Sequence, residues 1–226
     1  MLFYGVGTMS KFFDVNNKFF TALSKIWDLI ILDIIFLIAL FAFIGPACTA
    51  LYYAIVKNIR RSRDYTWSTF WHSFKSNFRQ GAVLGVLQLV VGAGLLFCYS
   101  FAVKMNPDVY IAQVYYWVTI ALILLYFMIS IYMYPLLSRF SMKNIEIIRM
   151  SLFLSFRHLP TTILGMLGFA AVILFWDRGL MFSPLVLVAP SVYVFLLSFP
   201  MEKVLHKYMP KKEELTEEEQ MAWYNE

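Results

Sequence analysis

Five long stretches without a charged side chain constrain this chain more than any motif in it. An apolar stretch of about 18 or more residues is long enough to cross a membrane as a helix. The sequence therefore predicts an all-α fold, a polytopic transmembrane helical bundle of about five spans. The uncharged stretches are Ile34–Val56, Gly81–Val103, Val109–Ser138, Leu159–Trp176 and Gly179–Met201.

The composition excludes an ordinary soluble domain. Of the 226 residues, 61% are hydrophobic and 15% are charged, whereas soluble domains have about 45–50% apolar and about 25% charged residues. The two cysteines, Cys48 and Cys98, both lie inside apolar stretches. Their spacing indicates neither a redox motif nor a zinc site, so we expect buried thiols.

Charge divides the chain into three segments. Residues 1–28 are predicted to form an N-terminal interfacial amphipathic helix, residues 29–201 a transmembrane domain, and residues 202–226 a charged cytoplasmic tail. Basic connectors at 57–80 and 138–158 separate the predicted spans. The spans are about 29–56 with a bend at Gly45-Pro46, then 81–103, 112–137, 159–176 and 180–200.

Lysine and arginine counts predict the orientation in the cell membrane. The connectors 57–80 and 138–158 hold six and four of these residues, and the loops 104–108 and 177–179 hold one each. Because cytoplasmic loops carry the positive excess, we expect both connectors and the C-terminus in the cytoplasm. The same excess favours a bilayer with anionic headgroups as the partner. No nucleic-acid motif accompanies it.

The first predicted span leaves two topologies open. Five crossings place the N-terminus outside, together with Lys11, Lys18 and Lys25, against the usual charge distribution. In the alternative, the chain turns at Gly45-Pro46 and returns as a short helix over residues 47–63. We prefer five crossings, and the proline break decides between the two.

Residues 64–80 have the clearest amphipathic pattern. Their aromatic side chains recur at helical spacing on one face, and Lys75 and Arg79 lie across from them. We expect the aromatic rings to lie at the headgroup boundary and the cations to face the lipid phosphates. A second stripe, Ile145, Ile148, Leu152 and Phe156, marks the other connector. The predicted interfacial anchors are Trp67, Phe70, Trp71, Phe74, Lys75, Phe78 and Arg79.

Small residues and prolines mark expected contacts and bends. Gly81, Gly85 and Gly92 fall on one helix face, which predicts close helix packing. Pro135 is expected to bend the end of the span that contains it, as Pro46 does.

Two polar residues inside apolar stretches are the candidate intramembrane site. A carboxylate in a membrane usually faces a cavity or a partner. Asp33 either does so or lies close enough to the interface to reach water. Gln88 is either an interhelical hydrogen-bond partner or a tolerated polar residue, and we prefer the second.

Catalytic and metal-binding patterns do not appear in the sequence. The three histidines (72, 158 and 206) lie on separate connectors, without metal-ligand spacing. No phosphate-binding loop, nucleophile elbow or dinucleotide fingerprint is present. We therefore expect no enzyme activity and no cofactor.

Several stretches together resemble the YesL family of bacterial integral membrane proteins. They are Ile44–Tyr53 (IGPACTALYY), the aromatic pattern Trp67–Phe78, Tyr134–Phe140, His158–Thr162 and Pro190–Tyr193. The family is a domain of unknown function often encoded beside carbohydrate ABC transporters and sugar-degrading enzymes. This sequence has Phe41 and Phe43 where the family often has an extra proline and a threonine, so the bend is expected to be milder here.

The resemblance implies an accessory role in oligosaccharide uptake, with ABC transporter subunits as partners, and it supplies no catalytic residues. A non-enzymatic membrane accessory protein is the first hypothesis. A small membrane transporter or channel that uses the Asp33 carboxylate is the second. A membrane enzyme is the third and has no residue cluster to support it.

Overall fold

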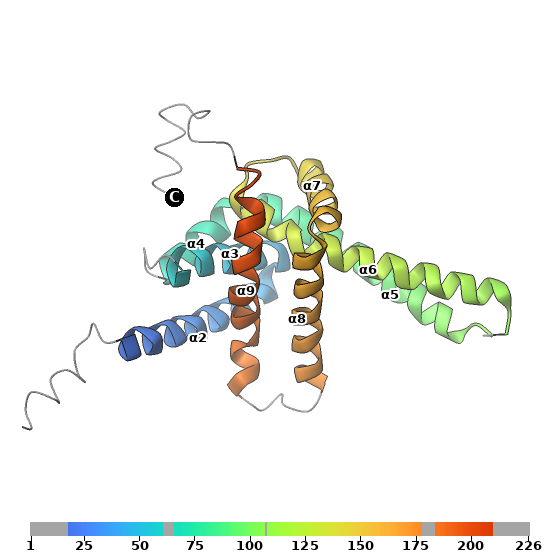
Figure 1. Cartoon of the computed structure of the whole chain (residues 1–226), viewed down its shortest axis with the longest axis horizontal. Helices are drawn as coiled ribbons and strands as arrows, with labels where there is room; N and C mark the ends of the chain where they lie inside the picture. Colours follow the sequence, from blue (N-terminus) through green and yellow to red (C-terminus); the bar gives the residue numbers. More distant parts are fainter. Residues whose placement is uncertain (1–17, 61–65, 107, 178–183, 210–226) are drawn as a thin grey trace, which may run out of the picture.

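The computed structural model describes residues 18–60, 66–106, 108–177 and 184–209, and helices make up nearly all of them (Figure 1). No strand occurs in these ranges, so the predicted all-α class is confirmed for them. The helices are α2 (Lys18–Ala42), α3 (Ile44–Ala54), the π-helical η1 (Ile55–Arg60), α4 (Thr66–Ser76), α5 (Phe78–Lys104), α6 (Tyr110–Arg139), α7 (Asn144–Arg157), α8 (Leu159–Asp177) and α9 (Pro184–Leu205).

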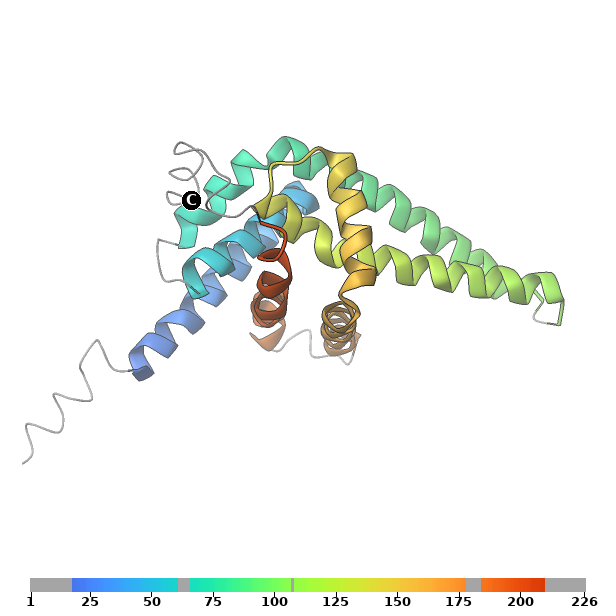
Figure 2. The ribbon, with the colours of Figure 1, turned by 45° about the horizontal axis from the view of Figure 1, so that its top comes forward.

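The chain reverses at Phe43 instead of bending at Gly45-Pro46. Phe43 is extended, with φ −159° and ψ 117°, and α3 returns beside α2, which contacts both α3 and η1 (Figure 2). Pro46 lies in the first turn of α3, where a backbone N–H has no acceptor within the helix, so proline costs little there. The expected single bent span over 29–56 is corrected to two helices side by side.

Helix α3 lies at the centre of the fold. It contacts α2, α4, α5, α6 and α9. Its small residues Ala47, Ala50 and Ala54 are each 0% exposed, and small side chains allow neighbouring helices to approach closely.

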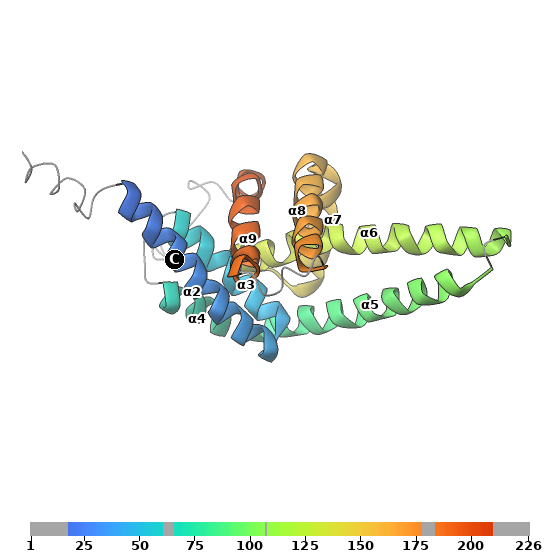
Figure 3. The ribbon, with the colours of Figure 1, turned by 90° about the horizontal axis from the view of Figure 1, so that it is seen from below.

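Helices α5 and α6 form a hairpin that extends away from the other helices (Figures 1 and 3). In the described part of the chain, these are the two helices long and apolar enough to cross a membrane. The pair α7 and α8, bent by 100°, could supply a third span. Because the hairpin runs across the direction of α8 and α9 in Figure 1, the expected bundle of five spans is not confirmed.

The aromatic face of α4 packs inward, contrary to its expected role at the headgroups. Phe70 is 0% and Phe74 7% exposed, in a core cluster with α2 and α3. Trp71 is half-buried, whereas Trp67 and Phe78 are exposed, as are Lys75 and Arg79. An amphipathic stripe shows only that one face avoids water, and here α2 and α3 cover Phe70 and Phe74.

Helix α7 keeps an apolar stripe on its exposed side. Ile147 and Leu154 are both 0% exposed and turn toward the core, whereas Ile145 is 64% and Phe156 56% exposed. The predicted stripe is therefore largely the outer face of α7.

Parts of the predicted end segments lie outside the described residues. Of the expected interfacial helix over residues 1–28, the structure describes 18–28, which form the first part of α2. Of the expected tail 202–226, residues 202–205 belong to α9. Met201 and Glu202 are buried, so this part of the predicted tail is a packed helix.

Candidate functional site

Gln88 of α5 joins a hydrogen-bond network with α6. Its Nε2 donates to Ser130 Oγ over 2.7 Å, and its Oε1 accepts from the Tyr134 hydroxyl. The Tyr126 hydroxyl donates to the Gln88 backbone carbonyl over 3.2 Å. Ser130 Oγ in turn donates to the Tyr126 carbonyl over 2.7 Å. Gln88 is thus an interhelical partner, not the merely tolerated polar residue that we preferred.

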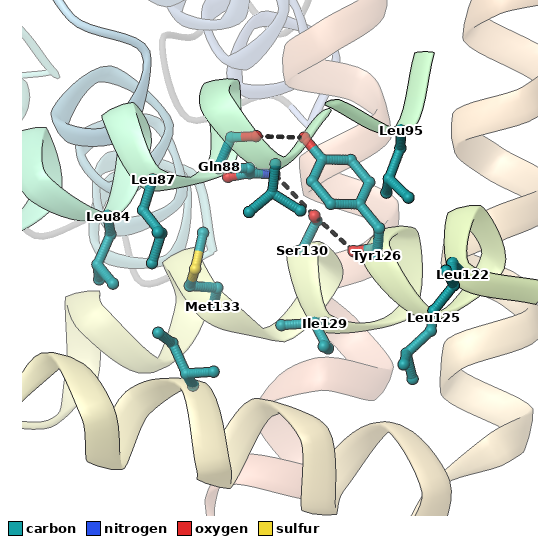
Figure 4. A pocket seen from close by; sticks show the side chains of 12 residues that line it. Leu84, Leu87, Gln88, Leu95, Leu122, Leu125, Tyr126, Ile129, Ser130 and Met133 are labelled. Carbon is teal, nitrogen blue, oxygen red and sulfur yellow. Dashed lines mark hydrogen bonds between the residues drawn. The ribbon is translucent and has the colours of Figure 1, made fainter. Parts of the chain in front are cut away.

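A cavity of about 250 Å³ lies beside this network, between α5 and α6 (Figure 4). Leucine, isoleucine and valine side chains form most of its wall, and Ile148 of α7 also lines it. Gln88, Ser130 and Tyr126 are its polar lining residues, and they are hydrogen-bonded to one another. Because those polar groups already have partners, the cavity suits an apolar occupant.

Asp33 of α2 faces a partner inside the protein. Its side chain is 0% exposed. The backbone N–H of Ser191 in α9 is shared between the two carboxylate oxygens, at 3.1 Å from Oδ1 and 3.2 Å from Oδ2. Ser191 follows Pro190, which lacks an N–H and disturbs the helix around it. Asp33 therefore joins α2 to α9 at a proline position and does not reach water at the interface.

A buried ion pair that the sequence reasoning missed joins three helices. Arg139 at the end of α6 holds Glu202 of α9, and Tyr52 of α3 donates its hydroxyl to Glu202 Oε1 over 2.8 Å. One signal could have found the pair. Arg139 and Glu202 are each the first charged residue after an uncharged stretch, which places them at corresponding ends of two apolar helices.

The predicted glycine face of α5 contacts the start of α3. A Cβ added to Gly45 would lie 1.9 Å from the Gly81 carbonyl oxygen, and one added to Gly85 would lie 2.8 Å from the Gly45 nitrogen. A Cβ on Gly92 would lie 2.9 Å from the Tyr126 hydroxyl. The backbones of α3 and α5 thus touch at a distance that only glycine permits.

Pro135 lies within α6, which continues for four further residues to Arg139. The helix does not end at Pro135, and both Tyr134 and Pro135 are buried.

Among the described residues, no group of three or more His, Cys, Asp or Glu side chains could hold a metal ion. His158 lies at the junction of α7 and α8, where its Nε2 is 3.2 Å from the Tyr208 hydroxyl. Burial, then Lys207 and Arg157, lower the pKa of His158 from its usual 6.5.

The described part of the chain is all-helical, and two of its helices, α5 and α6, are long and apolar enough to cross a membrane. Comparison with known proteins finds similarity to proteins of unknown function. Residues 19–99 match the family described as "Protein of unknown function, DUF624". The chain is 25% identical over 172 residues to "Uncharacterized protein YesL" of Bacillus subtilis (strain 168), covering 74% of this chain and 80% of that protein. No solved structure matches the chain.

Proposed function

We propose that the protein is a non-enzymatic, multi-pass protein of the cell membrane that assists oligosaccharide uptake by docking on transporter subunits. The link to carbohydrate uptake comes from what the YesL resemblance implies. The observation that carries the docking is the exposed apolar surface of the α5–α6 hairpin. Only 17% of the most apolar stretch of α5 is buried, against 39% for α6. A hairpin so little covered by its own chain offers lipid or a partner helix a long apolar face.

The buried polar groups support a structural role for the interior. Ser191 engages the Asp33 carboxylate, Ser130 and Tyr134 engage the Gln88 amide, and Arg139 engages Glu202. Each of these groups joins one helix to another. Their contacts favour a stable scaffold over a polar path for a solute.

The charge distribution supports an orientation with the basic connectors in the cytoplasm. Helix α5 begins after α4, which carries the exposed Lys75, and α6 ends at Arg139, shortly before the exposed Lys143. The far end of the hairpin has Lys104 as its single basic residue. The reversal at Phe43 supports a cytoplasmic N-terminus as well, because α3 returns the chain to the end of α2 from which it came.

Affinity purification from native membranes tests the docking. Leu96 and Phe97 are 66% and 74% exposed on α5, so replacing both with alanine should lower recovery of transporter subunits without disturbing the core. Leu167→Ala on α8 is the matched control, since Leu167 is also exposed, at 64%. Recovery of the protein alone, from cells grown on complex glycans, would reject the proposal. Normal growth of a deletion strain on those glycans would reject the role in uptake.

A small transporter or channel is the second candidate, because a carboxylate that is 0% exposed lies beside Pro190 within α9. A carboxylate inside a membrane often marks an ion or substrate pathway. Reconstituted vesicles should then show solute flux that Asp33→Asn weakens. Vesicles that pass no sugars, ions or protons would exclude this candidate.

A further inference from the structure

The cavity between α5 and α6 has the shape and chemistry to hold a lipid tail. We propose that it binds an acyl chain of a membrane phospholipid whose headgroup lies at Arg149 of α7. This proposal concerns the inner side of the hairpin and does not depend on docking to a transporter.

The cavity is elongated. Its α5 wall runs from Leu84 to Leu95, a length of about 16 Å at a rise of about 1.5 Å per residue. Its volume of about 250 Å³ exceeds that of engineered apolar cavities of about 150 Å³, which stay dry and bind small apolar molecules. A long, narrow apolar space fits an unbranched chain better than a compact ring.

The wall of the cavity offers water few hydrogen-bonding groups. The side-chain amide of Gln88 is hydrogen-bonded to Ser130 and Tyr134. The Tyr126 hydroxyl donates to the Gln88 backbone carbonyl (Figure 4). Water in such a space would lose hydrogen bonds that the wall cannot replace. The outer face of α5 next to the cavity is apolar too, with Val86 52% and Val90 65% exposed. In a membrane, acyl chains are therefore the apolar molecules that meet this hairpin.

The headgroup position follows from α7. Ile148 lines the cavity, and the exposed Arg149, the next residue of α7, lines a surface hollow with Met150 and Phe153. A guanidinium is well suited to bind phosphate. Glu146 also lines that hollow, and its carboxylate, which accepts the backbone N–H of Lys143 over 3.0 Å, keeps its negative charge and would repel a phosphate placed beside it. A lipid phosphate at Arg149 would thus place its acyl chain at the Ile148 end of the cavity.

The amount of phospholipid that the purified protein retains measures the occupancy of the cavity between α5 and α6. The protein is extracted from membranes, washed in detergent, and assayed for phosphate and fatty acids per chain. Val91→Trp fills the cavity, and the neighbouring Val90→Trp adds the same bulk on the outer face. We expect Val90→Trp to retain phospholipid like the wild type. Val91→Trp should retain about tenfold less, equivalent to about 1.4 kcal/mol.

A second pair of variants, on α6, keeps the test valid if the Val91→Trp protein does not fold. Leu122 lines the cavity from α6, whereas Leu124 lies outside its lining, and both side chains are 47% exposed. Leu122→Trp should lose the lipid and Leu124→Trp should keep it, with helical content by circular dichroism as the folding control. Arg149→Gln should shift the retained lipid away from anionic headgroups. Equal retention by the inner and outer variants, or a wild type washed free of phospholipid, would overturn the proposal.

Discussion

The Arg139 guanidinium holds the Glu202 carboxylate through two parallel hydrogen bonds. Nε donates to Oε1 over 3.2 Å and Nη2 donates to Oε2 over 3.0 Å. The two side chains are 14% and 8% exposed, so neither charge is well hydrated. The pair fixes the ends of α6 and α9 together, with the Tyr52 hydroxyl of α3 as a third partner.

Glu202→Gln should lower the free energy of unfolding by about 3–5 kcal/mol, because it leaves the Arg139 charge buried without its counterion. Unfolding by denaturing detergent in mixed micelles measures the change. The exposed neighbour Lys203→Gln is the control and should stay within about 0.5 kcal/mol. Replacing Arg139 and Glu202 together with methionine should recover much of the loss. A double variant no more stable than Glu202→Gln would contradict the ion-pair explanation.

Alanine at Gly81 should destabilise the protein by about 1–3 kcal/mol, because its Cβ would press on the backbone of Pro46. The nearest atom, the Pro46 nitrogen, would be 2.9 Å away. Gly94 lies on the same helix with nothing within 4 Å of an added Cβ, so Gly94→Ala should be neutral or slightly stabilising. Thermal unfolding of both variants makes the comparison, and equal effects would show that the α3–α5 contact is looser than described.

Gln88 and Ser130 should be energetically coupled across α5 and α6. A double-mutant cycle of Gln88→Leu and Ser130→Ala should give a coupling energy of about 0.6 to 1.7 kcal/mol, as found for interhelical hydrogen bonds in membranes. Denaturing-detergent titrations of the single and double variants provide the four free energies. Additive effects would mean that the hydrogen bond contributes nothing to stability.

Acidification should weaken the junction of α7 and α8. The pKa of His158 is lowered in the folded protein from its usual 6.5, so the unfolded chain binds a proton first as the pH falls. The contribution to stability is complete above the unfolded value and is lost as the pH falls through the lower folded value. Unfolding temperatures measured from neutral to acidic pH should fall less for His158→Gln than for the wild type. The exposed His206→Gln should follow the wild type.

The helices themselves could be predicted from the sequence because their apolar stretches are long and free of charge. The span predicted at 81–103 lies within α5 (Phe78–Lys104), and that predicted at 112–137 lies within α6 (Tyr110–Arg139). Glycine spacing also indicated a packing face on α5, although not its partner. These features are local, so a single sequence carries them.

Contacts between distant helices could not be predicted in the same way. Asp33 and Ser191 are 158 residues apart, and nothing in either segment specifies the other. The aromatic pattern of α4 indicated an apolar face, yet a headgroup boundary and a neighbouring helix would select the same pattern. Pro46 indicated a break, but the direction of the returning chain depends on how α3 packs against α2 and α5.

The glycine contact between α3 and α5 has a mechanical consequence. Gly81 and Gly85 lie near the start of a helix of 27 residues, which is about 40 Å long. The α5–α6 hairpin is therefore anchored to α3 close to one end, and most of its length extends beyond that contact. Backbone atoms in direct contact allow little sliding where α3 meets α5. A force applied to the loop between α5 and α6 would therefore be transmitted to α3 as a torque. A small rotation at the α3–α5 contact would move the loop between α5 and α6 through a much larger distance.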